Sequence, residues 1–200
     1  MKLVLATTNK GKLKEITALL SGLGVEVKGL SDFPGCPEVV EDGKTFRENA
    51  LKKAREVAAF TGLPALADDS GLEVDALDGA PGVYSARFSG KDADDGKNNR
   101  KLLKLLKDTP QAGRGCRFVC VLAFAGPPGS GIREKVLRGE VKGRVAHEPR
   151  GPHGFGYDPL FYYHPARKTF AEMGPEAKNR VSHRGRALKK FREYLKGQTL

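Results

Sequence analysis

The chain opens with a short apolar run that turns polar and leads at once into a helical pattern. The run Lys2–Ala6 has the character of a first β-strand, and the polar segment Thr7-Thr8-Asn9-Lys10 follows it directly. Apolar residues then recur at the spacing of one helix face, which predicts a helix over Gly11–Leu20. This opening fits an α/β fold, and a length of 200 residues suits one compact domain in one or two lobes.

Periodicity and turn residues predict the remaining elements. The segment Thr45-Phe46-Arg47-Glu48 fits a capping box, so a second helix begins there, and Gly62 and Pro64 end it. The other predicted helices contain Leu102–Leu106 and Ala187–Leu195, and the other predicted strands are Val25–Lys28, Pro64–Ala67, Leu72–Leu77, Arg117–Ala125 and Ile132–Val141.

Composition excludes several classes of protein. Hydrophobic residues make up 39% of the chain and charged residues 30%, so neither disorder nor a membrane protein is indicated. No apolar run approaches the roughly 20 residues of a membrane span, and the first run is too short for a signal peptide, which predicts the cytoplasm. The net charge of +11 favours nucleic acid, anionic membrane surfaces or phosphorylated small molecules, and charge alone does not choose among them.

The three cysteines are too few and too scattered for a disulfide framework. Cys116 and Cys120 have the spacing of possible metal ligands, but they lie in an apolar, strand-like run, and no second pair of ligands follows. Buried, reduced thiols are therefore the favoured interpretation.

The segment from Thr7 to Lys12 joins the first predicted strand to a helix N-terminus. Backbone N–H groups at such a terminus bind anions, and Lys10 and Lys12 add positive charge, so a phosphate cradle is one interpretation. The spacing of a P-loop is absent. An ordinary capped helix with solvated lysines explains the same residues equally well.

Two acidic segments could hold a metal ion. Asp68-Asp69-Ser70-Gly71 lies between two predicted strands, and adjacent carboxylates repel unless a cation or a catalytic task compensates them. Their oxygens suit Mg²⁺, and we favour this function over an acidic turn. Glu38-Val39-Val40-Glu41-Asp42 could complete the metal site, although the residues alone favour a solvated loop.

Two further segments have functional and structural interpretations. Gly154-Phe155-Gly156-Tyr157-Asp158-Pro159 could bring the backbone and an aromatic ring against a base, or could be a turn with buried aromatic residues. In Lys178–Arg186, Ser182 is a good N-cap, and Arg184 could donate to a purine carbonyl or a phosphate. A solvated basic surface is the alternative for this last segment.

Six ordered sequence blocks, spread over nearly the whole chain, carry a more specific signal. They are Leu5–Lys12, Glu41–Phe46 with Glu48-Asn49-Ala50, Ala67–Leu72, Gly79–Arg87, Gly154–Pro159, and Lys178–Gly185. With these blocks the sequence resembles the non-canonical purine nucleoside triphosphate pyrophosphatases, also called inosine triphosphate or dITP/XTP pyrophosphatases.

The resemblance implies one α/β domain over residues 1–200, two-lobed around a long mixed β-sheet, with the active site in the cleft between the lobes. It implies a homodimer that hydrolyses ITP, dITP and XTP to the monophosphate and pyrophosphate with Mg²⁺, and so removes them from the nucleotide pool. Neither a stable nucleic-acid partner nor a membrane is expected.

The resemblance also implies roles for individual residues. Asp69 matches the proton acceptor and a metal ligand, and Glu41 matches the other metal-binding acid. His153 departs from the family pattern, which has a small residue there, and could crowd the base pocket. The residues that match substrate contacts are Thr7, Thr8, Asn9, Lys10, Gly11, Lys12, Lys53, Ser70, Phe155, Gly156, Tyr157, Asp158, Lys178, His183 and Arg184.

Base choice has a physical explanation in this interpretation. Hypoxanthine and xanthine carry a 6-oxo acceptor where adenine carries a donor, so donors from His183 or Arg184 favour the oxo bases. A pyrophosphatase of related fold acting on modified pyrimidine triphosphates is the alternative enzyme. A basic nucleic-acid-binding module is the alternative of another class, but the cations are dispersed among acidic and glycine-rich loops.

Overall fold

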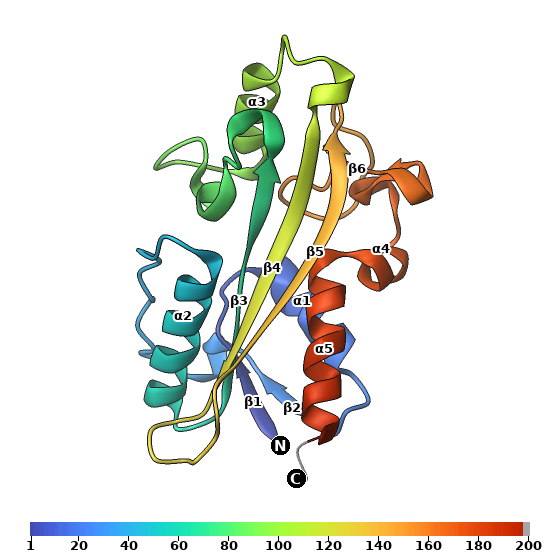
Figure 1. The fold of residues 1–200 in the computed structure, drawn as a ribbon. Coiled ribbons are helices and arrows are strands. Elements are labelled where there is room, and N and C mark those ends of the chain that lie inside the picture. The colour runs from blue at the N-terminus through green and yellow to red at the C-terminus, as the bar shows by residue number, and fades with distance from the viewer. Residues whose placement is uncertain (198–200) are drawn as a thin grey trace. The chain divides into compact units, whose positions relative to one another are not determined.

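The computed structural model describes residues 1–197 of the protein. The helices and strands are β1 (Lys2–Leu5), α1 (Lys10–Leu20), β2 (Glu26–Lys28), α2 (Phe46–Thr61), β3 (Ala65–Val74), α3 (Asp95–Leu105), β4 (Gly115–Ala125), β5 (Lys135–Val145), β6 (Phe161–Tyr163), β7 (Lys168–Thr169), α4 (Pro175–Val181) and α5 (His183–Gly197) (Figure 1). The strands form one sheet in the order β2-β1-β3-β4-β5-β6-β7. Because β1 is parallel to β2 and β3 whereas β6 is antiparallel to β5 and β7, the predicted α/β fold with a mixed sheet is confirmed. None of the helices in residues 1–197 has the length and apolar character needed to cross a membrane.

The chain divides into two compact units. Among the described residues, the first unit contains Met1–Asp69, Cys120–Gly139 and residues 184–197, and the second contains Ser70–Val119 and Glu140–His183. Strands β3, β4 and β5 contribute residues to both units, and each unit has a hydrophobic core of its own. The location of the active site in a cleft stays a prediction.

In the first unit, one face of the strands packs against α1 and α5. Leu3 and Leu5 of β1 share a core with Ile16 of α1 and Phe191 of α5. Side chains alternate along a strand, so Val4, which is also fully buried, points to the opposite face. Strand β1 is therefore covered on both faces, as its unbroken apolar sequence requires.

Helix α2 lies on the other side of these strands from α1 and α5 (Figure 1). Its N-cap Thr45 accepts a hydrogen bond from the backbone N–H of Glu48 at 3.1 Å, and Glu48 Oε2 accepts from the backbone N–H of Thr45 at 3.1 Å. The predicted capping box is thus confirmed. Gly62 ends the helix in the left-handed conformation, with a φ of 67°.

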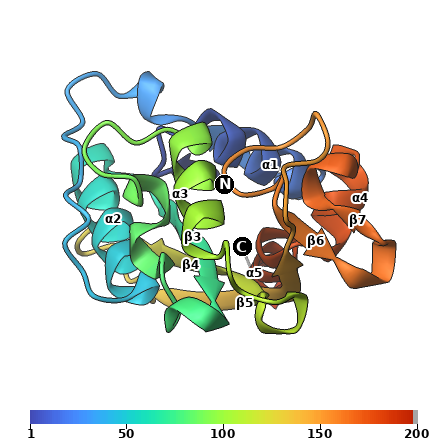
Figure 2. The same ribbon diagram turned by 90° about the horizontal axis from the view of Figure 1, so that it is seen from above.

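Aromatic side chains form much of the core of the second unit. The ring of Phe161 on β6 lies 4.6 Å, centroid to centroid, from both Phe118 on β4 and Phe170. Leu102 brings α3 onto the same core. Figure 2 shows β6, β7 and α4 lying together within this unit.

The prediction of two short strands around a turn at Asp68–Gly71 is wrong, because β3 runs unbroken from Ala65 to Val74. The turn was expected because acidic residues and glycine are depleted in strands. In the structure Asp68 has buried partners that compensate its charge, described below. Gly71 belongs in the strand because a side chain there would collide with Ser85.

The second long hairpin strand lies farther along the chain than predicted. The expected range was Ile132–Val141, whereas β5 occupies Lys135–Val145. Its residues are mostly charged or half-buried, so its alternation is weak in the sequence and its bounds could not be placed accurately.

Arg114 joins three backbone segments inside the second unit and is only 1% exposed. Its guanidinium donates from Nη1 to the carbonyl of Leu106 at 2.6 Å, from Nε to that of Val145 at 2.9 Å, and from Nη2 to that of Ala146 at 3.1 Å. These bonds tie the segment that follows α3 to the end of β5.

We expect Arg114→Leu to lower the free energy of unfolding by about 3 kcal/mol, because three buried carbonyls lose their donor. Urea unfolding of the purified variant measures this loss. Arg55→Leu is the matched control: Arg55 is exposed and pairs with Glu134 at 2.6 Å, so its loss should cost less than about 1 kcal/mol. Equal losses in the two variants would contradict a structural role for Arg114.

Candidate active site

Asp68 and Asp69 are neighbours on β3, and their carboxylates point to opposite faces of the strand. The Asp68 carboxylate meets side chains from α1 and α5, whereas that of Asp69 meets Lys53 of α2. The mutual repulsion expected from the sequence is therefore relieved by the strand itself, and each acid has cations of its own.

The carboxylate of Asp68 is fully buried among cations. Its Oδ1 lies 2.7 Å from Lys12 Nζ, and its Oδ2 lies 2.9 Å from Arg184 Nε. Cys120 Sγ on β4 donates to the same Oδ2 at 3.1 Å. Burial alone would raise the pKa of Asp68, but Arg184 and Lys12 outweigh it and hold the pKa well below its usual range. Asp68 is therefore ionised at neutral pH.

Arg184 begins the chain's return to the first unit and is only 2% exposed. Besides Asp68, it pairs through Nη1 with Glu15 Oε2 of α1 at 2.5 Å. Burial opposes the charge of the guanidinium, but Asp68 and Glu15 overcome this and raise its pKa. The alternative of a solvated basic surface does not hold for this residue, because two carboxylates hold its guanidinium inside the unit.

Asp69 shares one cation with Glu41. Lys53 Nζ lies 2.6 Å from Glu41 Oε1 and 3.5 Å from Asp69 Oδ1, and it also donates to the carbonyl of Asp68 at 2.9 Å. Burial raises the pKa of Asp69 against the opposing effect of Lys53 and Lys12, with Glu41 adding to the rise. The two predicted metal ligands, Glu41 and Asp69, are thus both paired with the ammonium group of Lys53.

Asp69 Oδ2 is the feature of this cluster that fits a bound cation. It is buried and has no hydrogen-bond partner among the described residues. Residues 1–197 hold no group of three or more His, Cys, Asp or Glu side chains arranged to bind a metal. Mg²⁺ takes one or two carboxylates together with substrate phosphates and water, so the pair Asp69 and Glu41 suits Mg²⁺ better than a metal with a closed protein cage.

The N-terminus of α1 is a capped helix start, and its role as a phosphate cradle stays a prediction. Asn9 is the N-cap and accepts from the backbone N–H of Lys12 at 2.9 Å, while Thr7 Oγ1 accepts from the N–H of Asn9 at 3.2 Å. Lys10 is exposed, as in an ordinary capped helix. Lys12 is not solvated, because its ammonium turns inward to Asp68.

The predicted aromatic loop lies in the second unit and is held by an ion pair. Asp158 Oδ2 accepts from Lys178 Nζ at 2.5 Å and from the backbone N–H of Phe155 at 2.9 Å. The Lys178 ammonium also lies 4.9 Å from the centre of the Phe155 ring. Lys178 and Asp158 were predicted as separate substrate contacts. They form one buried ion pair next to the Phe155 ring.

Helix α3 supplies side chains that hold this loop by hydrogen bonds and that the sequence analysis missed. The N–H of Gly156 donates to Asp95 Oδ2 at 2.6 Å, and Asn99 Nδ2 donates to the carbonyl of Gly156 at 3.0 Å. Tyr157 Oη donates to the carbonyl of Ser85 at 2.9 Å. The one available signal was a pair of asparagines inside a helix, where asparagine is a poor helix former and often bonds to other backbone.

The structure groups the predicted residues by unit. Thr7, Thr8, Asn9, Lys10, Gly11, Lys12, Glu41, Lys53, Asp69 and Arg184 lie in the first unit, and Ser70, Phe155, Gly156, Tyr157, Asp158, Lys178 and His183 lie in the second. His183 is buried with its ring stacked 4.6 Å from that of Phe118, centroid to centroid. His153 is exposed, and its backbone N–H donates to the carbonyl of Ala171 at 3.0 Å.

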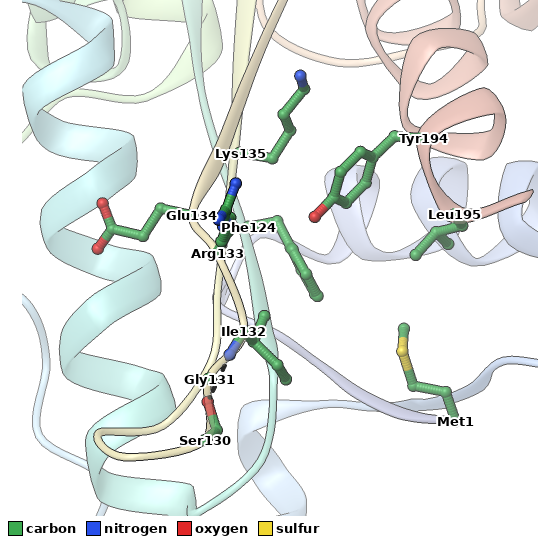
Figure 3. Close-up of a pocket in the computed structure, with 10 residues that line it drawn as sticks. All are labelled: Met1, Phe124, Ser130, Gly131, Ile132, Arg133, Glu134, Lys135, Tyr194 and Leu195. Atoms are coloured by element: carbon green, nitrogen blue, oxygen red, sulfur yellow. Dashed lines mark hydrogen bonds between the residues drawn. The ribbon is translucent and has the colours of Figure 1, made fainter. Parts of the chain in front are cut away.

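A cavity of about 620 Å³ in the first unit is separate from this chemistry (Figure 3). Its wall combines Phe124, Ile132 and Tyr194 with the cationic side chains Arg133 and Lys135. None of the predicted site residues is among the ten residues that line it.

We expect Asp68→Asn to lower the free energy of unfolding at pH 7 by about 3 kcal/mol, since it removes the ion-pair partner of Lys12 and leaves the buried Arg184 with Glu15 alone. The folded pKa of Asp68 is lowered, so its contribution is complete above the unfolded value of about 4 and is lost as the pH falls through the folded pKa. The difference from the unsubstituted protein should therefore shrink below about pH 4. Urea unfolding from pH 3 to pH 8 tests this, with the exposed Asp108→Asn as control. A difference independent of pH would contradict it.

Known proteins match this sequence over nearly the whole chain. A dITP/XTP pyrophosphatase of Desulforamulus reducens is 57% identical over 195 residues, which cover 98% of this chain and 96% of that protein. A dITP/XTP pyrophosphatase of Geobacter sulfurreducens is 56% identical over 97% of this chain and 96% of that protein.

Solved structures agree as well. A HAM1 protein from Coxiella burnetii is 42% identical and matches with a TM-score of 0.89, covering 98% of each chain. A nucleoside-triphosphatase / dITP/XTP pyrophosphatase from Mycobacterium abscessus is 48% identical, with a TM-score of 0.76 over 96% of this chain and 98% of that one. The sequence model of the Ham1 family matches residues 3–194, and the chain belongs to the Ham1 family.

Proposed function

We propose that this protein is a nucleoside triphosphate pyrophosphatase that hydrolyses non-canonical purine nucleotides, namely ITP, dITP and XTP, to the monophosphate and pyrophosphate. The observation that carries the proposal is Asp69, a buried carboxylate with one unpartnered oxygen, next to a second acid and a shared lysine. The names of full-length relatives with half or more of their residues identical support the same substrate class.

Glu41 and Asp69 would hold a divalent metal ion, which we propose to be Mg²⁺. Their oxygens are the ligands that Mg²⁺ prefers, and Asp69 Oδ2 is buried without completing a hydrogen bond in the described chain. Such an ion neutralises phosphate oxygens and lowers the pKa of a bound water.

The remaining residues of the first unit would work on the triphosphate. The reaction forms a bond between a water oxygen and the α-phosphorus and breaks the bond from that phosphorus to the α,β-bridging oxygen, which leaves with pyrophosphate. Asp69 would accept the proton of the water. Lys10, Lys12 and Lys53, with the α1 N-terminus from Thr7 to Gly11, stabilise the negative charge that moves to the leaving group.

We assign the base and the remaining substrate contacts to Ser70, Phe155–Asp158, Lys178, His183 and Arg184. Phe155 would stack on the purine, with the Lys178–Asp158 pair holding its loop. Arg184 is fixed by Asp68 and Glu15, so it would enter the complex at little cost in side-chain entropy. A fixed donor favours the 6-oxo bases over adenine.

The protein as a whole would act in the cytoplasm on the free nucleotide pool. We propose a homodimer of the single domain 1–200 without a stable nucleic-acid partner. The dispersed arrangement of its cations, several of which are engaged by carboxylates inside the protein, supports small phosphorylated substrates over a polymer.

We expect pyrophosphate release from ITP, dITP and XTP in the presence of Mg²⁺, with much lower kcat/KM for GTP and ATP and no turnover with EDTA. Asp69→Asn keeps the shape of the side chain but removes the proton acceptor, so kcat should fall by about 1000-fold. A pyrophosphate assay across the five nucleotides measures both, with circular dichroism to show that the variant is folded.

Asp108→Asn is the matched control, because it removes an exposed carboxylate and should leave kcat unchanged. Release of pyrophosphate from dUTP or dTTP but not from ITP would contradict the proposed substrate class. Substantial activity in folded Asp69→Asn would contradict the role of Asp69.

A further inference from the structure

Two polar residues on one face of α2 lie close to the acidic residues Glu41 and Asp69 or to the segments that carry them. Lys53, which joins Glu41 to Asp69, is preceded by Asn49 one helical turn earlier. Asn49 is fully buried, although asparagine is normally exposed and is a poor former of helix interiors. A buried polar side chain at this position requires partners, and its two ends face different segments.

The oxygen end of Asn49 holds the segment that carries Glu41. Asn49 Oδ1 accepts from the backbone N–H of Gly43 at 2.8 Å. A Cβ atom at Gly43 would lie 2.6 Å from this same oxygen, so the close approach requires glycine. The loop two residues after Glu41 is thereby attached to α2.

The nitrogen end of Asn49 is directed to the other acid. The Asn49 side chain is one of the groups that act on the Asp69 carboxylate. Asn49 Nδ2 and Asp69 Oδ2 are both buried, and neither completes a hydrogen bond within the described chain. A buried donor and a buried acceptor on neighbouring side chains are each costly to leave unpaired.

We propose that Asn49 is a positioning residue, whose amide nitrogen sets the orientation of the Asp69 carboxylate while its oxygen fixes the loop of Glu41. One side chain thus couples the placement of both acids. The inference rests on the proposed function, since it assigns Asn49 a role in the same reaction. Groups that orient metal-binding and reacting side chains typically change activity by 10- to 100-fold when they are removed.

Two substitutions separate the ends of the amide. Asn49→Asp keeps the oxygen that accepts from Gly43 but removes the donor to Asp69. Asn49→Leu removes both ends and adds no charge. Because both variants lack the donor, we expect kcat for ITP at saturating Mg²⁺ to fall by roughly 10- to 100-fold in both.

Binding supplies a readout that does not depend on turnover. Calorimetry with the α,β-methylene analogue of ITP, in the presence of Mg²⁺, should give a Kd within about threefold of the unsubstituted protein for Asn49→Leu, because orientation of the proton acceptor affects the reaction more than binding. Thr45→Ala is the matched control in the same helix. It removes the N-cap and should lower Tm by a few degrees while kcat stays unchanged.

The outcomes distinguish the alternatives. Full activity in Asn49→Asp would show that only the bond to Gly43 matters, and full activity in Asn49→Leu would show that the added charge matters; either result overturns the proposal. A loss of analogue affinity in Asn49→Leu as large as the loss of kcat would also overturn it, because general distortion would then be the cause. If the unsubstituted protein did not hydrolyse ITP, the proposed function itself would fall.

Discussion

The alternation of side chains along β3 places two consecutive carboxylates on opposite faces of the strand, and the chemistry of the first unit follows from this separation. Asp68 turns toward Lys12 and Arg184, and these cations keep it ionised. Asp69 turns toward α2, where it shares Lys53 with Glu41 and keeps one oxygen without a partner. Adjacent positions in the sequence therefore have different surroundings: one anion is fully paired within the structure, and the other is the acid to which we assign the chemistry.

Burying so many charges is unfavourable in free energy, and the structure offsets this because each buried ion pairs with more than one partner. An isolated carboxylate or guanidinium inside a protein costs several kcal/mol, which only close, well-oriented partners recover. Asp68 meets this condition with two cations, and Arg184 meets it with two anions, Asp68 and Glu15. Since these residues come from α1, β3 and the start of α5, the same network that compensates the charges also joins these elements.

The sequence predicted elements whose signals are local and failed where long-range contacts decide. The capping box at Thr45 was correct because it needs only four consecutive residues. The continuity of β3 through Asp68 was missed, because that acid belongs in a strand only when Lys12 and Arg184 reach it from distant parts of the chain. The resemblance to a family predicted which residues take part in the site. It did not predict which side chain each of them contacts, such as Asp158 for Lys178, because those contacts depend on the folded structure.

The thiol of Cys120, which donates to Asp68, has a consequence for the handling of the protein. Burial and the neighbouring negative charge raise its pKa, and burial raises the pKa of Cys36 and Cys116 as well. Alkylating agents and peroxides react with the thiolate, which is scarce at neutral pH when the pKa is high. Cys116 and Cys120 are buried and should resist such reagents, whereas Cys36 is only half-buried and is the cysteine on which a probe could be attached.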